Sequence, residues 1–196
     1  MTQDPTRRGL LLAAAFAAGG LSLPEPALAQ GLPPTPECKD GDEPTGAQTE
    51  GPFYKARSPQ RADLREPGQS GRLVVLSGMV LTSRCRPVPR ALVDLWHADD
   101  KGDYDNRGFR YRGHVLTDEQ GRYQFRTIVP ALYPGRTRHY HVKVAVAGRP
   151  VLTTQLYFPN EPANSRDGLF QRALLMRVLD SGAGQSAEFS FVLDMA

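Results

Sequence analysis

Short runs of alternating apolar and polar residues, separated by turns rich in glycine and proline, recur along most of this chain. Successive side chains of a β-strand point to opposite faces, so this alternation is typical of strands with one buried face. The runs predict strands at residues 73–81, 91–96, 109–116, 121–129, 139–146, 151–158 and 188–193. Only residues 169–179 have helical spacing, and they predict a single helix or an ordered loop. The fold class is therefore expected to be all-β: an antiparallel β-sandwich with long loops and at most one short helix.

The first 29 residues have the composition of an export signal. Arg7 and Arg8 precede an apolar run at residues 10–20, and Ala27-Leu28-Ala29 offers a small-x-small cleavage site. The paired arginines resemble the twin-arginine export signal. The apolar run is shorter than the ~20 residues that span a bilayer. We therefore expect an exported protein, periplasmic or extracellular, with no stable membrane association after residues 1–29 are removed.

Residues 30–48 are rich in Pro, Gly, Asp, Glu and Thr and lack apolar periodicity, which predicts an extended N-terminal arm. Residues 49–196 are then long enough for one domain with one core. The arm is long enough to exchange between subunits, so a homo-oligomer is one hypothesis. In an oxidising compartment Cys38 and Cys85 can form a disulfide, and the alternative is two unpaired thiols.

The charge of the chain argues against nucleic acid as a partner. It has 24 basic and 21 acidic residues, a formal net charge of +3. This excess is small and evenly scattered, whereas nucleic-acid-binding domains have a concentrated basic patch. The chain has 2 cysteines, too few for a zinc site made of four cysteines, so any metal needs other ligands.

The candidate chemistry centres on His139 and His141. On an alternating strand these two side chains share one face, about 6.5–7 Å apart at Cα, while Tyr140 points to the other face. Two imidazoles on one face can hold a metal ion, although two ordinary surface histidines would give the same pattern. No acidic residue lies between residues 121 and 158 to complete such a site. Tyr133, on a turn before the strand, is a candidate donor, and the alternative is a turn aromatic packed on the core.

A tyrosine donor narrows the choice of metal. The phenol has an ordinary pKa of about 10, so it binds as a tyrosinate only next to a strongly acidic cation. Histidine together with tyrosine therefore indicates ferric iron.

Five strings of this sequence resemble the intradiol ring-cleavage dioxygenases, particularly their compact exported branch. The strings occur in the order of that family and extend over residues 49–193. They are Glu50-Gly51-Pro52-Phe53-Tyr54, residues 93–99, Gly102-Asp103-Tyr104, residues 133–141 and Leu152-Thr153-Thr154-Gln155.

The resemblance implies a non-haem Fe(III) dioxygenase whose substrates are a catechol and O2. It implies cleavage of the ring between the two hydroxylated carbons, giving a muconate-type dicarboxylate. The implied metal ligands are Tyr104, Tyr133, His139 and His141. Of these, Tyr133 would be displaced by the substrate and take up substrate protons.

Two further residues match the family's catalytic positions. Arg136 would stabilise negative charge that develops on the ring, and Gln155 would hydrogen-bond a ligand or substrate oxygen. Without the resemblance, the sequence would indicate that Arg136 is a solvated arginine in a turn and that Gln155 is a polar residue at a sheet edge.

Two other functions fit the same residues. One is an exported β-sandwich hydrolase or oxidase that uses the two histidines with zinc or copper. The other is a transthyretin-like binding module without catalysis.

Overall fold

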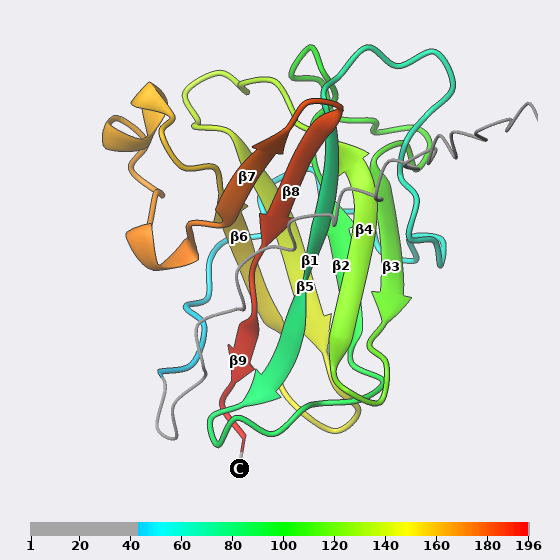
Figure 1. The fold of residues 1–196 in the computed structure, drawn as a ribbon, viewed down its shortest axis with the longest axis vertical. Helices are drawn as coiled ribbons and strands as arrows, with labels where there is room; N and C mark the ends of the chain where they lie inside the picture. The colour runs from blue at the N-terminus through cyan, green and yellow to red at the C-terminus, as the bar shows by residue number, and fades with distance from the viewer. Residues whose placement is uncertain (1–42, 196) are drawn as a thin grey trace, which may run out of the picture. The chain divides into compact units, whose positions relative to one another are not determined.

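The structure is a computed structural model that describes residues 43–195. The predicted export signal, residues 30–42 of the predicted arm and Cys38 lie outside the described residues. The described chain forms two β-sheets (Figure 1). The strands are β1 (Leu73–Thr82), β2 (Leu92–Trp96), β3 (Arg112–Leu116), β4 (Arg122–Ile128), β5 (His139–Ala145), β6 (Leu152–Tyr157), β7 (Arg177–Ser181), β8 (Gly184–Glu188) and β9 (Phe191–Leu193). This confirms the predicted β-sandwich.

One sheet has the strand order β4-β1-β8-β7, with β9 also paired to β1, and the other has the order β3-β2-β5-β6. Apolar residues of both sheets fill the space between them, among them Leu76 and Phe125 from the first sheet and Leu95 and Val142 from the second. Each is 0–1% exposed. The polar residues that alternate with them lie on the outer faces, as strand geometry requires.

The strand pairing is antiparallel except along one side of β1. There β8 and β9 both pair with β1 in parallel. Figure 1 shows β9 continuing beyond β8 along the same neighbour. The strand predicted at residues 188–193 is therefore interrupted, and Phe189 and Ser190 form the break.

The break lies next to Gly78, in the middle of β1. A Cβ at residue 78 would overlap the carbonyl oxygen of Phe189. That oxygen accepts a hydrogen bond from the Tyr123 hydroxyl at 2.7 Å, and the Phe189 N–H donates to the Ser77 carbonyl at 3.0 Å. Only glycine allows the two backbones to approach this closely.

The single helix considered for residues 169–179 is wrong, and the ordered loop is the better of the two predictions. The segment contains the short 3-10 helix η2 (Arg172–Leu174) and the start of β7, and another 3-10 turn, η1 (Pro162–Ser165), precedes it. Leu174 at the end of η2 and Met176 just before β7 are both buried. Residues two positions apart share a face of an extended chain and not of a helix, so this burial follows from the non-helical conformation of the segment.

The described part of the arm, residues 43–48, contains no helix or strand, as predicted. It crosses from one sheet to the other. The Thr45 N–H donates to the Val192 carbonyl of β9 at 2.8 Å, and the Gln48 N–H donates to the Thr153 carbonyl of β6 at 2.7 Å. The arm is thereby held at the edge of the domain.

Cys85 is disulfide-bonded, which is the first of the two alternatives that the sequence left open. Cys38 lies outside the described residues. No helix within residues 43–195 has the length and hydrophobicity to cross a membrane.

Candidate functional site

The strand register brings a row of functional side chains to the outer face of the four-stranded sheet. His141 of β5 pairs with Trp96 of β2 on one side and with Gln155 of β6 on the other. His139 pairs with Tyr157 of β6. On the opposite face of β5, Tyr140 and its apolar neighbours enter the core, which confirms the predicted division of the two faces.

The two histidines point their Nε2 atoms at each other, 3.1 Å apart. The His139 Nδ1–H donates to the Thr137 carbonyl at 2.6 Å, which leaves Nε2 of His139 as a bare acceptor. Such an arrangement is favourable only with a proton or a metal cation between the two nitrogens.

Both imidazoles are buried, with 5% and 3% of their surface exposed. Burial lowers the pKa of His139 to about 4 and the pKa of His141 well below its usual value. Neutral imidazoles with free nitrogen lone pairs are the form that binds metal ions.

The environment of His141 is tightly packed. Its ring stacks on Trp96, with centroids 5.0 Å apart and an interplanar angle of 8°. Gly51, whose φ is +70°, passes so close that a Cβ would lie 3.3 Å from Cε1 of His141. The glycine both adopts the left-handed conformation and gives the imidazole room.

Tyr104 completes a three-donor cluster. Its hydroxyl lies 3.4 Å from Nε2 of His139. Its ring stacks on Phe53, with centroids 4.4 Å apart. Burial raises the pKa of the Tyr104 phenol well above its usual value, although the charges of Arg136 and Arg112 oppose the shift. The phenol would therefore ionise only beside an additional positive charge.

The loop after β2 places Tyr104 against the loop after β4. Ala131 donates its N–H to the Asp99 carbonyl at 2.9 Å. Gly102, with a φ of +93°, lies so close to the second loop that a Cβ would be 2.5 Å from the Leu132 carbonyl oxygen. The backbone thus brings together two tyrosines that are far apart in the sequence.

The second of these tyrosines, Tyr133, is half-buried and borders the cluster. Its ring meets the Tyr104 ring edge-on at 5.9 Å and the Phe53 ring edge-on at 5.5 Å. The four predicted ligands therefore lie in one neighbourhood, with Tyr104, His139 and His141 in direct contact and Tyr133 against the Tyr104 ring.

Arg136 and Gln155 contact each other beside the histidines. The Arg136 Nη2 group donates to Oε1 of Gln155 at 2.6 Å. The Gln155 Nε2 group donates to the Thr49 carbonyl at 3.0 Å. Gln155 thus holds Arg136 and ties it to the backbone at Thr49, the first residue of the domain. The contact with a substrate or metal ligand stays a prediction.

The donor set fits a metal ion. Two imidazole–metal bonds of about 2.1 Å at nearly a right angle place their nitrogens about 3 Å apart, close to the 3.1 Å between His139 and His141. Oxygen from a tyrosine beside two neutral imidazoles suits a hard, trivalent ion. Within the described residues, no group of three or more His, Cys, Asp or Glu side chains offers another metal site.

A cavity of about 390 Å³ lies beside Tyr133, whose ring contacts Tyr104 of the cluster. Its walls include Tyr133, Arg136, Ala163 and Asp167. A cavity of this size can hold a small aromatic compound.

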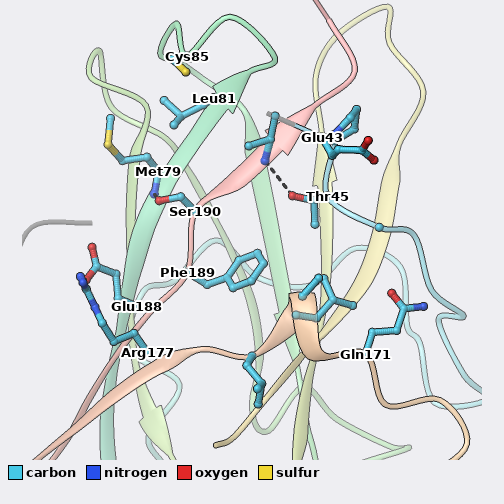
Figure 2. Close-up of a pocket in the computed structure, with 16 residues that line it drawn as sticks. Glu43, Thr45, Met79, Leu81, Cys85, Gln171, Arg177, Glu188, Phe189 and Ser190 are labelled. Carbon is cyan, nitrogen blue, oxygen red and sulfur yellow. Dashed lines mark hydrogen bonds and ion pairs between the residues drawn. The ribbon is translucent and has the colours of Figure 1, made fainter. Parts of the chain in front are cut away.

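A second and larger cavity, of about 1000 Å³, lies along β9 and η2 (Figure 2). The arm borders it through Glu43 and Thr45, and Phe189 lies at its centre in this view. Its described lining contains neither histidine nor tyrosine.

Sequence reasoning missed three contributors to the site. Phe53 and Gly51 lie within a string that marked the resemblance, but nothing in their local pattern indicated contact with Tyr104 or His141. Asp167, which pairs with Arg136 at 2.9 Å, follows it by 31 positions and carries no sequence signal at all.

Comparison with known proteins gives a consistent assignment. The family model described as "Dioxygenase" matches residues 49–194. Among solved structures, the dioxygenase domain of a fusion between a dioxygenase and a carbohydrate-binding protein, from Streptomyces sp. SirexAA-E, is 51% identical in sequence. It superimposes with a TM-score of 0.77, over 79% of this chain and 100% of that chain.

Curated relatives agree with this assignment. The catechol 1,2-dioxygenase of Acinetobacter baylyi is 31% identical over 144 residues, which are 58% of this chain and 46% of that protein. The hydroxyquinol 1,2-dioxygenase of a Rhizobium species is 30% identical over 172 residues, 71% of this chain and 58% of that protein. The chain thus spans about half the length of these relatives. Fold, motif order and sequence similarity together show that the chain belongs to the intradiol ring-cleavage dioxygenase family.

Proposed function

We propose that this chain is a non-haem Fe(III) dioxygenase that opens the ring of a catechol-type substrate between its two hydroxylated carbons. The second substrate is O2, and the product is a muconate-type dicarboxylate. The observation that carries the proposal is the cluster of Tyr104, His139 and His141, with donor atoms 3.1–3.4 Å apart, in the fold of this family.

His139, His141, Tyr104 and Tyr133 would hold the iron. When bound, ferric iron supplies a Lewis acid that lets a catechol bind as a dianion near neutral pH. Burial keeps both imidazoles neutral, so their Nε2 atoms are available as ligands below neutral pH as well.

The other residues bind the organic substrate and move its protons. Tyr133 borders the smaller cavity, and its phenolate oxygen would take up a proton from a substrate hydroxyl. Arg136 presents a fixed positive charge to the same cavity, where it would stabilise negative charge on the ring. Phe53 stacks on the Tyr104 ring and fixes its orientation in the cluster.

The proposal is tested with the full chain purified after expression in iron-supplemented medium. We expect about one iron per chain, a red-brown colour from tyrosinate-to-iron charge transfer, and O2 uptake with catechol that produces muconate absorbance. Resorcinol is the matched control, because its hydroxyls are not adjacent and cannot chelate one ion. A protein that binds zinc or copper instead, or binds iron without cleaving any of catechol, hydroxyquinol, chlorocatechol or protocatechuate, would contradict the proposal.

Export and oligomeric state stay predictions. The export signal at residues 1–29 is tested by fractionating cells that express the full chain, and the homo-oligomer by light scattering of the purified protein.

A further inference from the structure

Asp167 is a buried carboxylate that accepts hydrogen bonds on both of its oxygens. It is 7% exposed. Its Oδ2 atom accepts from the Arg136 Nε–H at 2.9 Å and from the Thr137 N–H at 2.8 Å, and its Oδ1 atom accepts from the Leu169 N–H at 2.9 Å. Burial opposes ionisation, but these N–H donors and the Arg136 charge outweigh it and lower the pKa of Asp167. The side chain is therefore a fixed anion.

Asp167 and Gln155 hold the Arg136 guanidinium at two points. Nε is bound to Asp167, and Nη2 is bound to Gln155 at 2.6 Å. A guanidinium has five N–H groups, so three N–H groups are not used by these two anchors. The guanidinium also lies close to the Tyr157 hydroxyl, and Arg136 borders the smaller cavity. The two anchors therefore leave one edge of the guanidinium available to a molecule in that cavity.

The position of Arg136 in the chain explains why it needs such anchors. It follows Gly135, whose φ is +77°, in an exposed turn between Tyr133 and β5. An arginine side chain has many rotamers, and a planar carboxylate partner selects one orientation in advance. A group that must meet charge developing on a substrate acts best when it is fixed beforehand.

Asp167 also contacts the backbone that leads to the metal ligands. It binds the Thr137 N–H, and the Thr137 carbonyl accepts the Nδ1–H of His139 at 2.6 Å. A purely structural role in supporting His139 is the competing explanation. The two roles predict different effects. If Asp167 orients Arg136, its loss acts only through Arg136. If it supports His139, its loss acts through the metal site.

We propose that Asp167 is a positioning residue that orients Arg136 toward the bound ring, an inference that rests on the proposed function. It acts through the ion pair with Nε and leaves the metal ligands intact.

A double-mutant cycle tests this role. We expect Arg136→Met to lower kcat for catechol about 100-fold, the lower end of the range seen when a transition-state hydrogen-bond donor is lost. We expect Asp167→Asn to lower it about 30-fold, because the donor is kept but less well oriented, as is typical of supporting residues. The double variant should be no more than three-fold below Arg136→Met, because Asp167 then has nothing to position. Iron content, charge-transfer colour and the dissociation constant of catechol, measured without oxygen, should match across all four proteins.

Glu161→Gln is the matched control. It breaks the Arg138–Glu161 ion pair, at 2.7 Å, which joins the same two chain segments. This variant should keep the wild-type kcat within two-fold. If Asp167→Asn does not fold, Asp167→Ser replaces it, since serine can accept from the Leu169 N–H in the same local turn without a carboxylate.

The outcomes are distinct. Additive losses in the cycle, or a loss of iron in Asp167→Asn, would overturn the positioning role while leaving the proposed function in place. A wild-type protein that cleaves no catechol would overturn the proposed function and this inference with it.

Discussion

Two cavities of this molecule differ in size and in chemistry. The larger, of about 1000 Å³, is lined mainly by apolar residues of β1, η2 and the break between β8 and β9 (Figure 2). The smaller, of about 390 Å³, is bordered by Tyr133, Arg136 and Asp167, and the Tyr133 ring contacts Tyr104 of the donor cluster. The larger cavity has more room, but the smaller one lies on the side of the candidate metal ligands. Convergent donor atoms, rather than volume, are therefore the basis for choosing the candidate site.

The chemical difference between the two cavities depends on which nearby polar side chains lack a complete set of hydrogen-bond partners. Around the larger cavity, the Thr45 hydroxyl accepts the Val192 N–H, and Arg177 and Glu188 form an ion pair. Near the smaller one, the Tyr133 ring contacts Tyr104, which lies against the histidine pair whose Nε2 atoms face each other. Groups kept buried and incompletely paired are costly, so they mark a place where a ligand is expected.

The largest effect should come from removing one donor of the cluster. Tyr104→Phe should lower ring-cleaving activity by more than about 100-fold, beyond the 10–100-fold typical of residues that only support a ligand. It should also weaken the charge-transfer absorption. Activity assays and a visible spectrum at equal protein concentration measure both.

Tyr140→Phe is the matched control for this experiment. Tyr140 lies on β5 between the two histidines but points into the core, where its hydroxyl donates to the Ile128 carbonyl at 2.8 Å. Its loss should cost about 1 kcal/mol of unfolding free energy and leave the colour unchanged. Equal loss of colour in both variants would contradict the assignment of Tyr104.

An intermediate effect should appear in acid, through His97 beneath the site. Burial lowers the pKa of His97 to about 4, while its Nε2 accepts from the Thr127 hydroxyl. The unfolded chain takes up this proton near pH 6.5 and the folded chain only near pH 4. Stability from neutral His97 is therefore complete above pH 6.5 and is lost as the pH falls toward 4, by up to about 3 kcal/mol.

Urea unfolding at pH 7 and pH 4.5 measures this loss. His97→Gln keeps a side chain that can hydrogen-bond both neighbours but does not titrate, so its stability should fall less between the two pH values. An unchanged pH dependence in His97→Gln would show that other buried groups, rather than His97, cause the acid sensitivity.

The smallest effect on activity should come from the larger cavity. Thr45→Ala removes the hydroxyl that accepts the Val192 N–H at 2.8 Å. We expect a loss of about 1 kcal/mol of stability, seen as a melting temperature about 2–4 °C lower, with kcat within two-fold of the wild type. A large loss of activity would show that the two regions are coupled through the arm and do not act independently.

Local alternation of apolar and polar residues predicted most strands and the shared face of His139 and His141. Such predictions succeed because the two-residue period is a property of the strand itself. The same reasoning failed at residues 169–179, where the apolar spacing also allowed a single helix. Leu174 and Met176 are buried there by tertiary packing, which the local pattern does not contain.

The sequence by itself determined most of the strands, though not β7 and β8, together with the family and the identity of the four candidate metal ligands. Only the tertiary structure decided which cavity borders Tyr133 and that Gln155 and Asp167 both hold Arg136. It also decided that the Phe189 carbonyl packs directly against Gly78. The physical reason is distance along the chain. Strand periodicity is encoded between neighbouring residues, whereas the Asp167–Arg136 ion pair joins residues 31 positions apart and exists only once two loops have packed together.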